Sequence, residues 1–154
     1  MIRLGNLELY VLHPSDPVDR YANTNNSSVV IRLEYGDVSF LFTGDVEALG
    51  ESEMLSELGS SASELLDIDI LKVAHHGSKT SSSEAFLSVV TPEVAVISVG
   101  EGNRYGLPDE ETLDALAEVG AEVYRTDHHG TVVVWTDGSQ YSVTTERGVE
   151  SALH

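Results

Sequence analysis

The chain has 154 residues, a length typical of one globular domain, and 41% of them are hydrophobic, enough to form a core. No run approaches the roughly 18 apolar residues of a membrane span, and the absence of cysteine excludes disulfides and thiolate metal sites. The 26 acidic residues outnumber the 8 basic ones and give a formal net charge of −18, which argues against strong non-specific binding of nucleic acid at ordinary salt.

The N-terminal third of the chain has the pattern of β structure. Apolar residues alternate with polar ones over residues 7–11, which predicts a first strand, and residues 14–27 have the composition of a loop. Residues 28–35 and 38–42 are rich in β-branched and aromatic side chains and flank a Gly-Asp pair at 36–37. This arrangement predicts a β-hairpin.

The middle of the chain alternates between two periodicities. Apolar residues at helical spacing are broken by Gly59 and Gly120, and short continuous apolar runs lie between the helical segments. The expected helices span residues 46–58, 81–90 and 109–119, and the expected strands span residues 68–73, 94–99 and 123–125.

The C-terminal residues return to a hairpin pattern, with strands expected at 132–135 and 141–144 around an Asp-Gly turn. The whole chain, residues 1–154, therefore predicts a single mixed α/β domain, in which one mixed sheet carries helices on one face. Trp135 is expected to take part in core or edge packing. The pair His128 and His129 precedes a glycine and is interpreted as a turn ordered by Asp127, while His13 and His154 are interpreted as incidental.

Two strand ends carry polar side chains that favour metal chemistry. Asp45 follows the strand that ends at residue 42, and His75 and His76 follow the strand that ends at residue 73. Carboxylate and imidazole are ligands of Zn²⁺ and Mn²⁺, and a carboxylate can bridge two ions. A Gly-Asp pair after a strand is also typical of a turn or a helix cap. The occurrence of both signals, each at a strand end, favours the metal site.

The segments around these strand ends resemble a known family. They are NNSSVV at 25–30, FLFTGD at 40–45, DILKVAHHGSKTS at 69–81 and AVISVG at 95–100, followed by Asn103, Tyr105-Gly106 and Pro108. Over roughly residues 7–143 the chain resembles the C-terminal half of the metallo-β-lactamase domain of ComEC/Rec2-type proteins. The resemblance implies the second half of an αββα sandwich, with the other face of the sheet normally covered by the missing half.

The resemblance also implies roles for individual residues. Asp45 matches the aspartate that bridges the metals, and His75 or His76 matches the last histidine ligand. His75 is favoured because related branches place the ligand first in an H-x-G-[ST] run, which leaves His76 to face the substrate or to orient the ligand. Ser78, Lys79, Asn103 and Tyr105 are expected near the substrate.

Two departures from the family pattern affect the expected activity. The His-x-His-x-Asp-His run of the first half does not occur among the six histidines, and Leu107 stands where the family often has a histidine. Catalytic zinc normally has about three protein ligands. The chain alone therefore carries only part of a site for zinc or manganese, and a dinuclear site needs ligands from elsewhere.

The resemblance leaves two functions open. The first is metal-dependent hydrolysis of phosphodiester bonds in DNA or nucleotides, once the missing half completes the site. The alternative is a non-catalytic, truncated relative that acts as an oligomerisation or interaction module. An uncovered apolar sheet face predicts a homodimer or a complementary N-terminal-half partner.

The composition adds an expectation about location. The first residues lack the pattern of a signal peptide, so we expect a cytoplasmic or otherwise soluble chain that reaches a membrane only through another domain. The acidic excess is typical of halophilic proteins, in which salt screens self-repulsion, and attraction of metal ions is a second interpretation.

Overall fold

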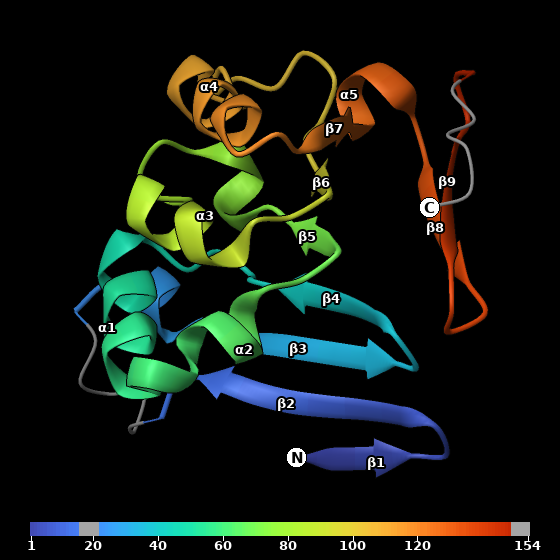
Figure 1. Cartoon of the computed structure of the whole chain (residues 1–154). Helices are drawn as coiled ribbons and strands as arrows, with labels where there is room; N and C mark the ends of the chain where they lie inside the picture. The colour runs from blue at the N-terminus through green and yellow to red at the C-terminus, as the bar shows by residue number, and fades with distance from the viewer. Residues whose placement is uncertain (16–21, 149–154) are drawn as a thin grey trace.

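The computed structural model describes residues 1–15 and 22–148, which form a seven-stranded mixed sheet with helices on one face and a β-hairpin on the other (Figure 1). The strand order follows the chain order. Strands β1 to β4 pair antiparallel, whereas β4 to β7 pair parallel. The seven strands are β1 (Ile2–Leu4), β2 (Leu7–His13), β3 (Val30–Tyr35), β4 (Val38–Phe42), β5 (Ile70–Lys72), β6 (Val94–Ile97) and β7 (Glu122–Arg125).

The larger core lies between this sheet and the helices. Leu41, Leu71 and Ala95 project from neighbouring strands and are fully buried against Met54 and Phe86 of the helical layer. The helices are α1 (Ala48–Leu58), α2 (Ala62–Leu66), α3 (Glu84–Val90) and α4 (Glu110–Glu118), with 3₁₀ turns η2 (Thr24–Ser27), η3 (Gly59–Ser61) and η4 (Ala74–Gly77). Burial on both faces explains why β6 has a continuous apolar sequence.

A second, smaller core lies on the other face of the sheet. Strands β8 (Val132–Thr136) and β9 (Tyr141–Thr145) pair with each other and form a sheet of their own. Their inward residues, including Val143, pack on Ile70 and Val94 of the large sheet. The chain leaves the large sheet because the one-turn helix α5 (Thr126–His129) and Gly130, at φ +70°, redirect it after β7.

The hairpin leaves part of this second face uncovered. One apolar row crosses β1 to β4, because opposite residues of antiparallel strands share a face. It consists of the directly paired residues Ile2, Leu9, Leu33 and Phe40. The next row continues with exposed apolar side chains, including Phe42 at 43% exposure. We call these two rows, completed by Val11 and Ile31, the apolar sheet face. Contiguous apolar surfaces are uncommon on monomeric proteins.

The predicted mixed α/β class is confirmed, and five details differ. Helix α2, strand β1 and the one-turn helix α5 were not expected; α5 replaces the predicted turn at His128 and His129. The last hairpin forms a separate sheet, so the expected single sheet is wrong. Trp135 is 55% exposed on the outer face of β8 and takes no part in the core.

Two expectations depend on residues that are not described. The loop expected over residues 14–27 lies partly outside the described residues, and His154 lies wholly outside them. Among the described residues, no helix has the length and apolar character that crossing a membrane requires.

Candidate metal centre

The candidate site lies at the carboxyl ends of the parallel strands. Strands β4 and β5 pair in register from Phe40 with Ile70 to Phe42 with Lys72, so the segments that follow them emerge side by side. The Thr43 hydroxyl donates to the carbonyl of Lys72 at 2.6 Å and joins the two strand ends. Ligands of open parallel sheets bind in the crevice at this edge.

The histidine pair lies in a left-handed turn. His75 and His76 have φ of +45° and +56°, and Gly77 follows at +82°. Such values disfavour side chains other than glycine and persist only where the surroundings enforce them, often at functional sites. Here the amide of His75 donates to the carbonyl of Gly44 at 3.1 Å, which fixes the turn against the loop that carries Asp45.

His76 and Asp45 face each other across the two strand ends. His76 Nε2 lies 3.8 Å from Asp45 Oδ1, and about half of each side chain is exposed. His76 Nδ1 lies 2.7 Å from the carbonyl oxygen of Ser98, an acceptor. The proton of a neutral ring therefore belongs on Nδ1, and Nε2 presents its lone pair beside the carboxylate.

His75 is directed elsewhere. Its Nδ1 lies 3.2 Å from the Thr80 hydroxyl and 3.5 Å from Glu47 Oε1, and only 26% of its side chain is exposed. The two imidazole rings are 6.4 Å apart and inclined by 60°. The geometry thus favours His76, the residue that sequence reasoning placed second, as the neighbour of Asp45.

The loop of Asp45 is held by the Asn-Asn-Ser-Ser segment. Ser28 Oγ accepts the amide of Asp45 at 3.1 Å. Buried Asn26 accepts the amides of Glu47 and Gly50 at 3.3 and 3.0 Å and thereby caps the first turn of α1. Asp45 is therefore not the helix cap, and its carboxylate accepts no hydrogen bond from the described residues.

One cation approaches the site from within the sheet. Burial lowers the pKa of Lys72, and the neighbouring Asp45 carboxylate partly opposes that shift. Its Nζ donates to the carbonyl of Val73 at 2.8 Å. Sequence reasoning assigned no role to Lys72, Glu47 or Ser98. Lys72 could have been found from its position at the end of the strand before the histidines. The sequence gives no indication that the backbone carbonyl of Ser98 contacts His76.

The donors present fit one half of a metal site. Two donors of a tetrahedral zinc ion lie about 3.3 Å apart, close to the separation of Asp45 and His76. The orientation of His76 by a carbonyl is typical of zinc-bound histidine. Within residues 1–15 and 22–148, however, no group of three or more histidine, aspartate, glutamate or cysteine side chains is close enough to hold an ion.

The structure gives other contacts to the residues that were expected near the substrate. Ser78 Oγ lies 3.1 Å from the Thr80 hydroxyl, and Lys79 Nζ reaches Glu111 of α4 at 3.5 Å. The side chain of Asn103 forms hydrogen bonds with backbone groups of its own loop. Asn103 and Tyr105 both line a pocket that also includes His76, and Tyr105 is 70% exposed.

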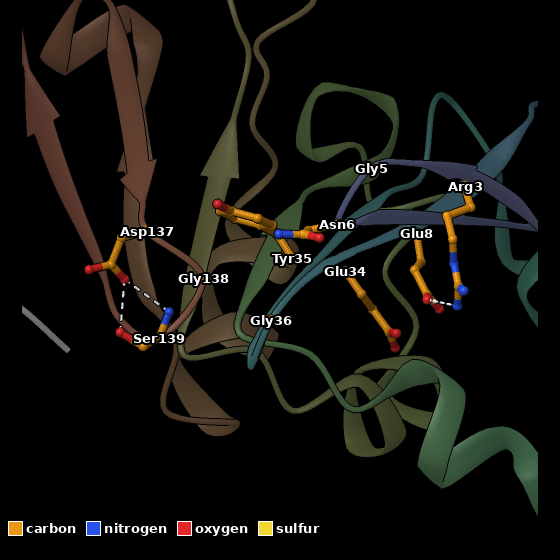
Figure 2. A pocket seen from close by; sticks show the side chains of 10 residues that line it. All are labelled: Arg3, Gly5, Asn6, Glu8, Glu34, Tyr35, Gly36, Asp137, Gly138 and Ser139. Atoms are coloured by element: carbon orange, nitrogen blue, oxygen red, sulfur yellow. Dashed lines mark hydrogen bonds and ion pairs between the residues drawn. The ribbon is translucent and has the colours of Figure 1, made fainter.

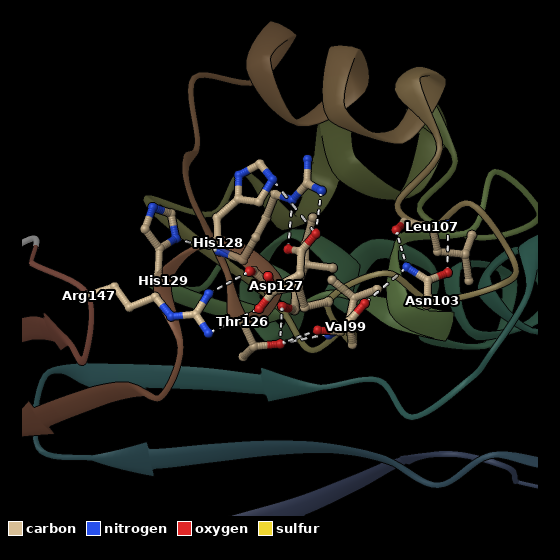
Figure 3. Close-up of polar contacts among 12 residues, drawn as sticks. Val99, Asn103, Leu107, Thr126, Asp127, His128, His129 and Arg147 are labelled. Atoms are coloured by element: carbon tan, nitrogen blue, oxygen red, sulfur yellow. Dashed lines mark hydrogen bonds and ion pairs between the residues drawn. The ribbon is translucent and has the colours of Figure 1, made fainter.

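The second histidine pair belongs to a structural network (Figure 3). Arg125 donates to both carboxylate oxygens of Asp127 at 3.0 and 2.6 Å, and this hydrogen-bonded pairing lowers the pKa of Asp127. His129 Nδ1 accepts the amide of Arg125 at 2.9 Å, and the Thr126 hydroxyl donates to the carbonyl of Val99 at 2.8 Å. These contacts fasten α5 to the sheet, so Asp127 orders this segment as expected.

A hollow of about 660 Å³ lies at the other end of β4, where three turns meet (Figure 2). Gly36 of the β3–β4 turn contacts Gly138 of the β8–β9 turn, and the amide of Asp37 donates to the carbonyl of Gly138 at 2.7 Å. The hollow lies at the opposite end of β4 from Asp45 and His76 and is therefore separate from the candidate metal centre.

Comparisons with known proteins show what the chain is similar to. Residues 13–101 match the metallo-beta-lactamase superfamily. ComE operon protein 3 of Bacillus subtilis is 38% identical over 132 residues, which cover 86% of this chain and 16% of that protein. Recombination protein 2 of Haemophilus influenzae is 39% identical over 83% of the chain and 15% of its own length, and competence protein ComA of Neisseria gonorrhoeae is 36% identical over 77% and 16%. The chain thus spans about a sixth of the length of these relatives.

Proposed function

The chain belongs to the metallo-β-lactamase superfamily, and from that premise we propose that it forms the second half of a metal-dependent phosphodiester hydrolase of the ComEC/Rec2 type. Its substrate is DNA or a nucleotide, a choice supported by the names of its relatives, which refer to competence and recombination. The observation that carries the proposal is the approach of His76 Nε2 to Asp45 Oδ1, with His76 Nδ1 fixed on the carbonyl of Ser98.

Asp45 and His76 would hold the metal from this half. A bound zinc or manganese ion supplies the Lewis acidity that phosphodiester hydrolysis needs. Asp45 would contribute a negative charge with two oxygens, and the hydrogen bond to the carbonyl of Ser98 would keep the Nε2 lone pair of His76 available as a ligand. The remaining ligands come from a segment outside the described residues or from another chain.

The apolar sheet face would receive that segment. It carries no charged side chain, although the chain as a whole has a net charge of −18. Its occupant is either a complementary N-terminal half or a second copy of the chain. Docking on this face would also bring new side chains towards Phe42, which precedes the Asp45 loop.

One observation favours the alternative, a non-catalytic interaction module: the described residues lack a three-residue metal group. The two functions differ in whether the chain retains metal. The test is elemental analysis and competition with a chromogenic chelator, applied to the full chain after dialysis against zinc or manganese.

Where another segment or a second copy of the chain completes the site, we expect the wild type to retain metal and the Asp45→Ala and His76→Ala variants to lose at least about tenfold in affinity, as loss of a ligand predicts. His75→Ala is the matched control and keeps its metal. If only His75→Ala lost its metal affinity, the ligand would be His75 and not His76. Retention by all three variants would remove the metal site from Asp45 and His76, and a metal-free wild type would leave the interaction module as the function of the isolated chain.

A further inference from the structure

Tyr105 is an exposed aromatic residue that the core does not explain. The residue is 70% exposed and belongs to neither hydrophobic core of the described residues. Leaving an aromatic ring in water forgoes a free energy of burial of about 2 kcal/mol. An exposed aromatic residue beside a candidate active site is therefore a candidate for ligand contact.

The loop that carries Tyr105 is ordered by Asn103. The Asn103 amide group donates to the carbonyls of Gly100 and Leu107 at 3.2 and 2.8 Å (Figure 3). Its carbonyl oxygen accepts the amides of Tyr105 and Leu107 at 3.2 and 3.1 Å. Asn103 thus orders the turn that displays Tyr105.

Arg104 adds a cation to the ring. Its guanidinium carbon lies 4.9 Å above the ring centroid of Tyr105, and Nη2 donates to the Tyr105 hydroxyl at 2.8 Å. Among the described residues, no carboxylate lies within ion-pair distance of Arg104, whereas Arg125, Arg147 and Lys79 each pair with an acid. The pair therefore presents a flat aromatic surface and a positive charge that no carboxylate of residues 1–15 and 22–148 pairs with.

A pocket connects Tyr105 to the candidate metal centre. Its volume is about 270 Å³, and His76, Ser98, Leu107 and Tyr105 are among its lining residues. This volume lies just below the usual range of about 300–1,000 Å³ for drug-sized ligands, so it suits a single planar ring system. The pocket begins at the imidazole that faces Asp45 and extends to the Tyr105 ring.

We propose that Arg104 and Tyr105 form a stacking platform for one unpaired base of a single-stranded nucleic acid, next to the phosphodiester that reaches His76. The inference rests on the proposed function and deepens it by naming the strand form of the substrate. A base within a duplex is covered on both faces by its neighbours, whereas an unpaired base can stack on an aromatic ring. Stacking also suits a chain whose net charge of −18 repels a phosphate backbone.

The test measures binding by fluorescence polarisation of a labelled oligothymidylate and of a blunt duplex of equal length. EDTA removes metal and prevents cleavage, and potassium chloride at about 1 M shortens the screening length to about 3 Å, so that charge repulsion contributes little. We expect the single strand to bind and the duplex not to bind. Tyr105→Ala weakens binding about tenfold or more, while Tyr105→Trp retains it.

Trp135→Ala is the control, because this ring is 55% exposed on β8, outside the pocket, and its loss leaves binding unchanged. Equal binding of the two strand forms, no binding at all, or an unaffected Tyr105→Ala would each overturn the platform. Because the measurement excludes metal, its outcome is separate from that of the metal test. Retained stacking with no metal affinity would overturn the hydrolase and leave the platform in place.

Discussion

Glu51 is a buried carboxylate that joins two helices. It lies on α1 with no exposed surface and accepts the amides of Ser82 and Ser83 at 2.5 and 2.9 Å and the Ser83 hydroxyl at 2.7 Å. Burial raises its pKa, and the hydrogen bonds from Ser83 and Ser82 oppose that shift only in part. These contacts fix the start of α3 against α1, close to the turn that carries the histidines.

This burial predicts a pH dependence of stability. A carboxyl whose pKa is raised on folding stabilises the native state fully below its unfolded value of about 4.5, and this contribution declines as pH rises through the folded pKa. Glutamine cannot ionise. Above about pH 4.5 the unfolding free energy of Glu51→Gln should therefore fall less steeply with rising pH than that of the wild type. Urea unfolding followed by circular dichroism at several pH values measures it.

Exposed Glu64 of α2 offers the matched control, because Glu64→Gln removes a carboxylate without removing a buried one. If the Glu51→Gln and wild-type curves stay parallel over the whole range, ionisation of Glu51 contributes nothing to the pH dependence of folding.

Sequence reasoning at this scale predicted the candidate donors but not their directions. Asp45 and the histidine pair stand out because they follow apolar strands. Which imidazole faces Asp45 depends on the left-handed backbone at His75 and His76, and no residue-type pattern encodes that turn. The role of the Ser98 carbonyl could not be predicted from the sequence either, since every residue has a backbone carbonyl.

At the scale of elements, a contact between two turns holds the hairpin on the sheet. Gly36 has φ +64°, and a Cβ there would lie 2.1 Å from the carbonyl oxygen of Gly138. Only the absence of a side chain lets the β3–β4 turn meet the β8–β9 turn and allows the bond from Asp37 to Gly138.

Gly36→Ala should therefore destabilise the protein by about 2–4 kcal/mol, through backbone strain and overpacking together. Gly5→Ala is a sharp control: Gly5 has the same φ of +64°, but no atom lies within 4 Å of its added Cβ. The midpoint of chemical unfolding measures both variants. Equal losses in the two would mean that strain alone acts and that the contact between the turns is dispensable.

The elements themselves were largely predictable from periodicity and turn residues. The hairpin of β3 and β4, the helices α1, α3 and α4, and the parallel strands all follow from local sequence. Whether the last hairpin extends the large sheet or forms its own depends on the path of residues 126–131, a tertiary feature. Strand β1 has only three residues, too few for a periodic signal.

For the whole molecule, the apolar sheet face and the net charge of −18 act in opposite directions. The face favours association, because burying apolar surface is favourable. The charge opposes the approach of a second copy, and salt screens this repulsion within about 10 Å at 0.1 M and about 3 Å at 1 M.

Self-association of the isolated chain should therefore increase with potassium chloride, and Phe42→Lys should reduce it. Light scattering coupled to size-exclusion chromatography measures the molar mass. Leu49→Lys is the control, since Leu49 is 58% exposed on α1, on the helical side of the sheet. A monomer at every salt concentration would assign the apolar sheet face to a different partner.

The left-handed turn at His75 also has a consequence for chemical synthesis. The region near φ +45° is the mirror image of the one that L-residues prefer, so it is the natural conformation of a D-amino acid. A chain assembled by ligation with D-histidine at position 75 would hold the same backbone without the strain that the L-residue carries. Handedness at one α-carbon thus offers a way to stabilise the turn that presents His76 while leaving the composition of the protein unchanged.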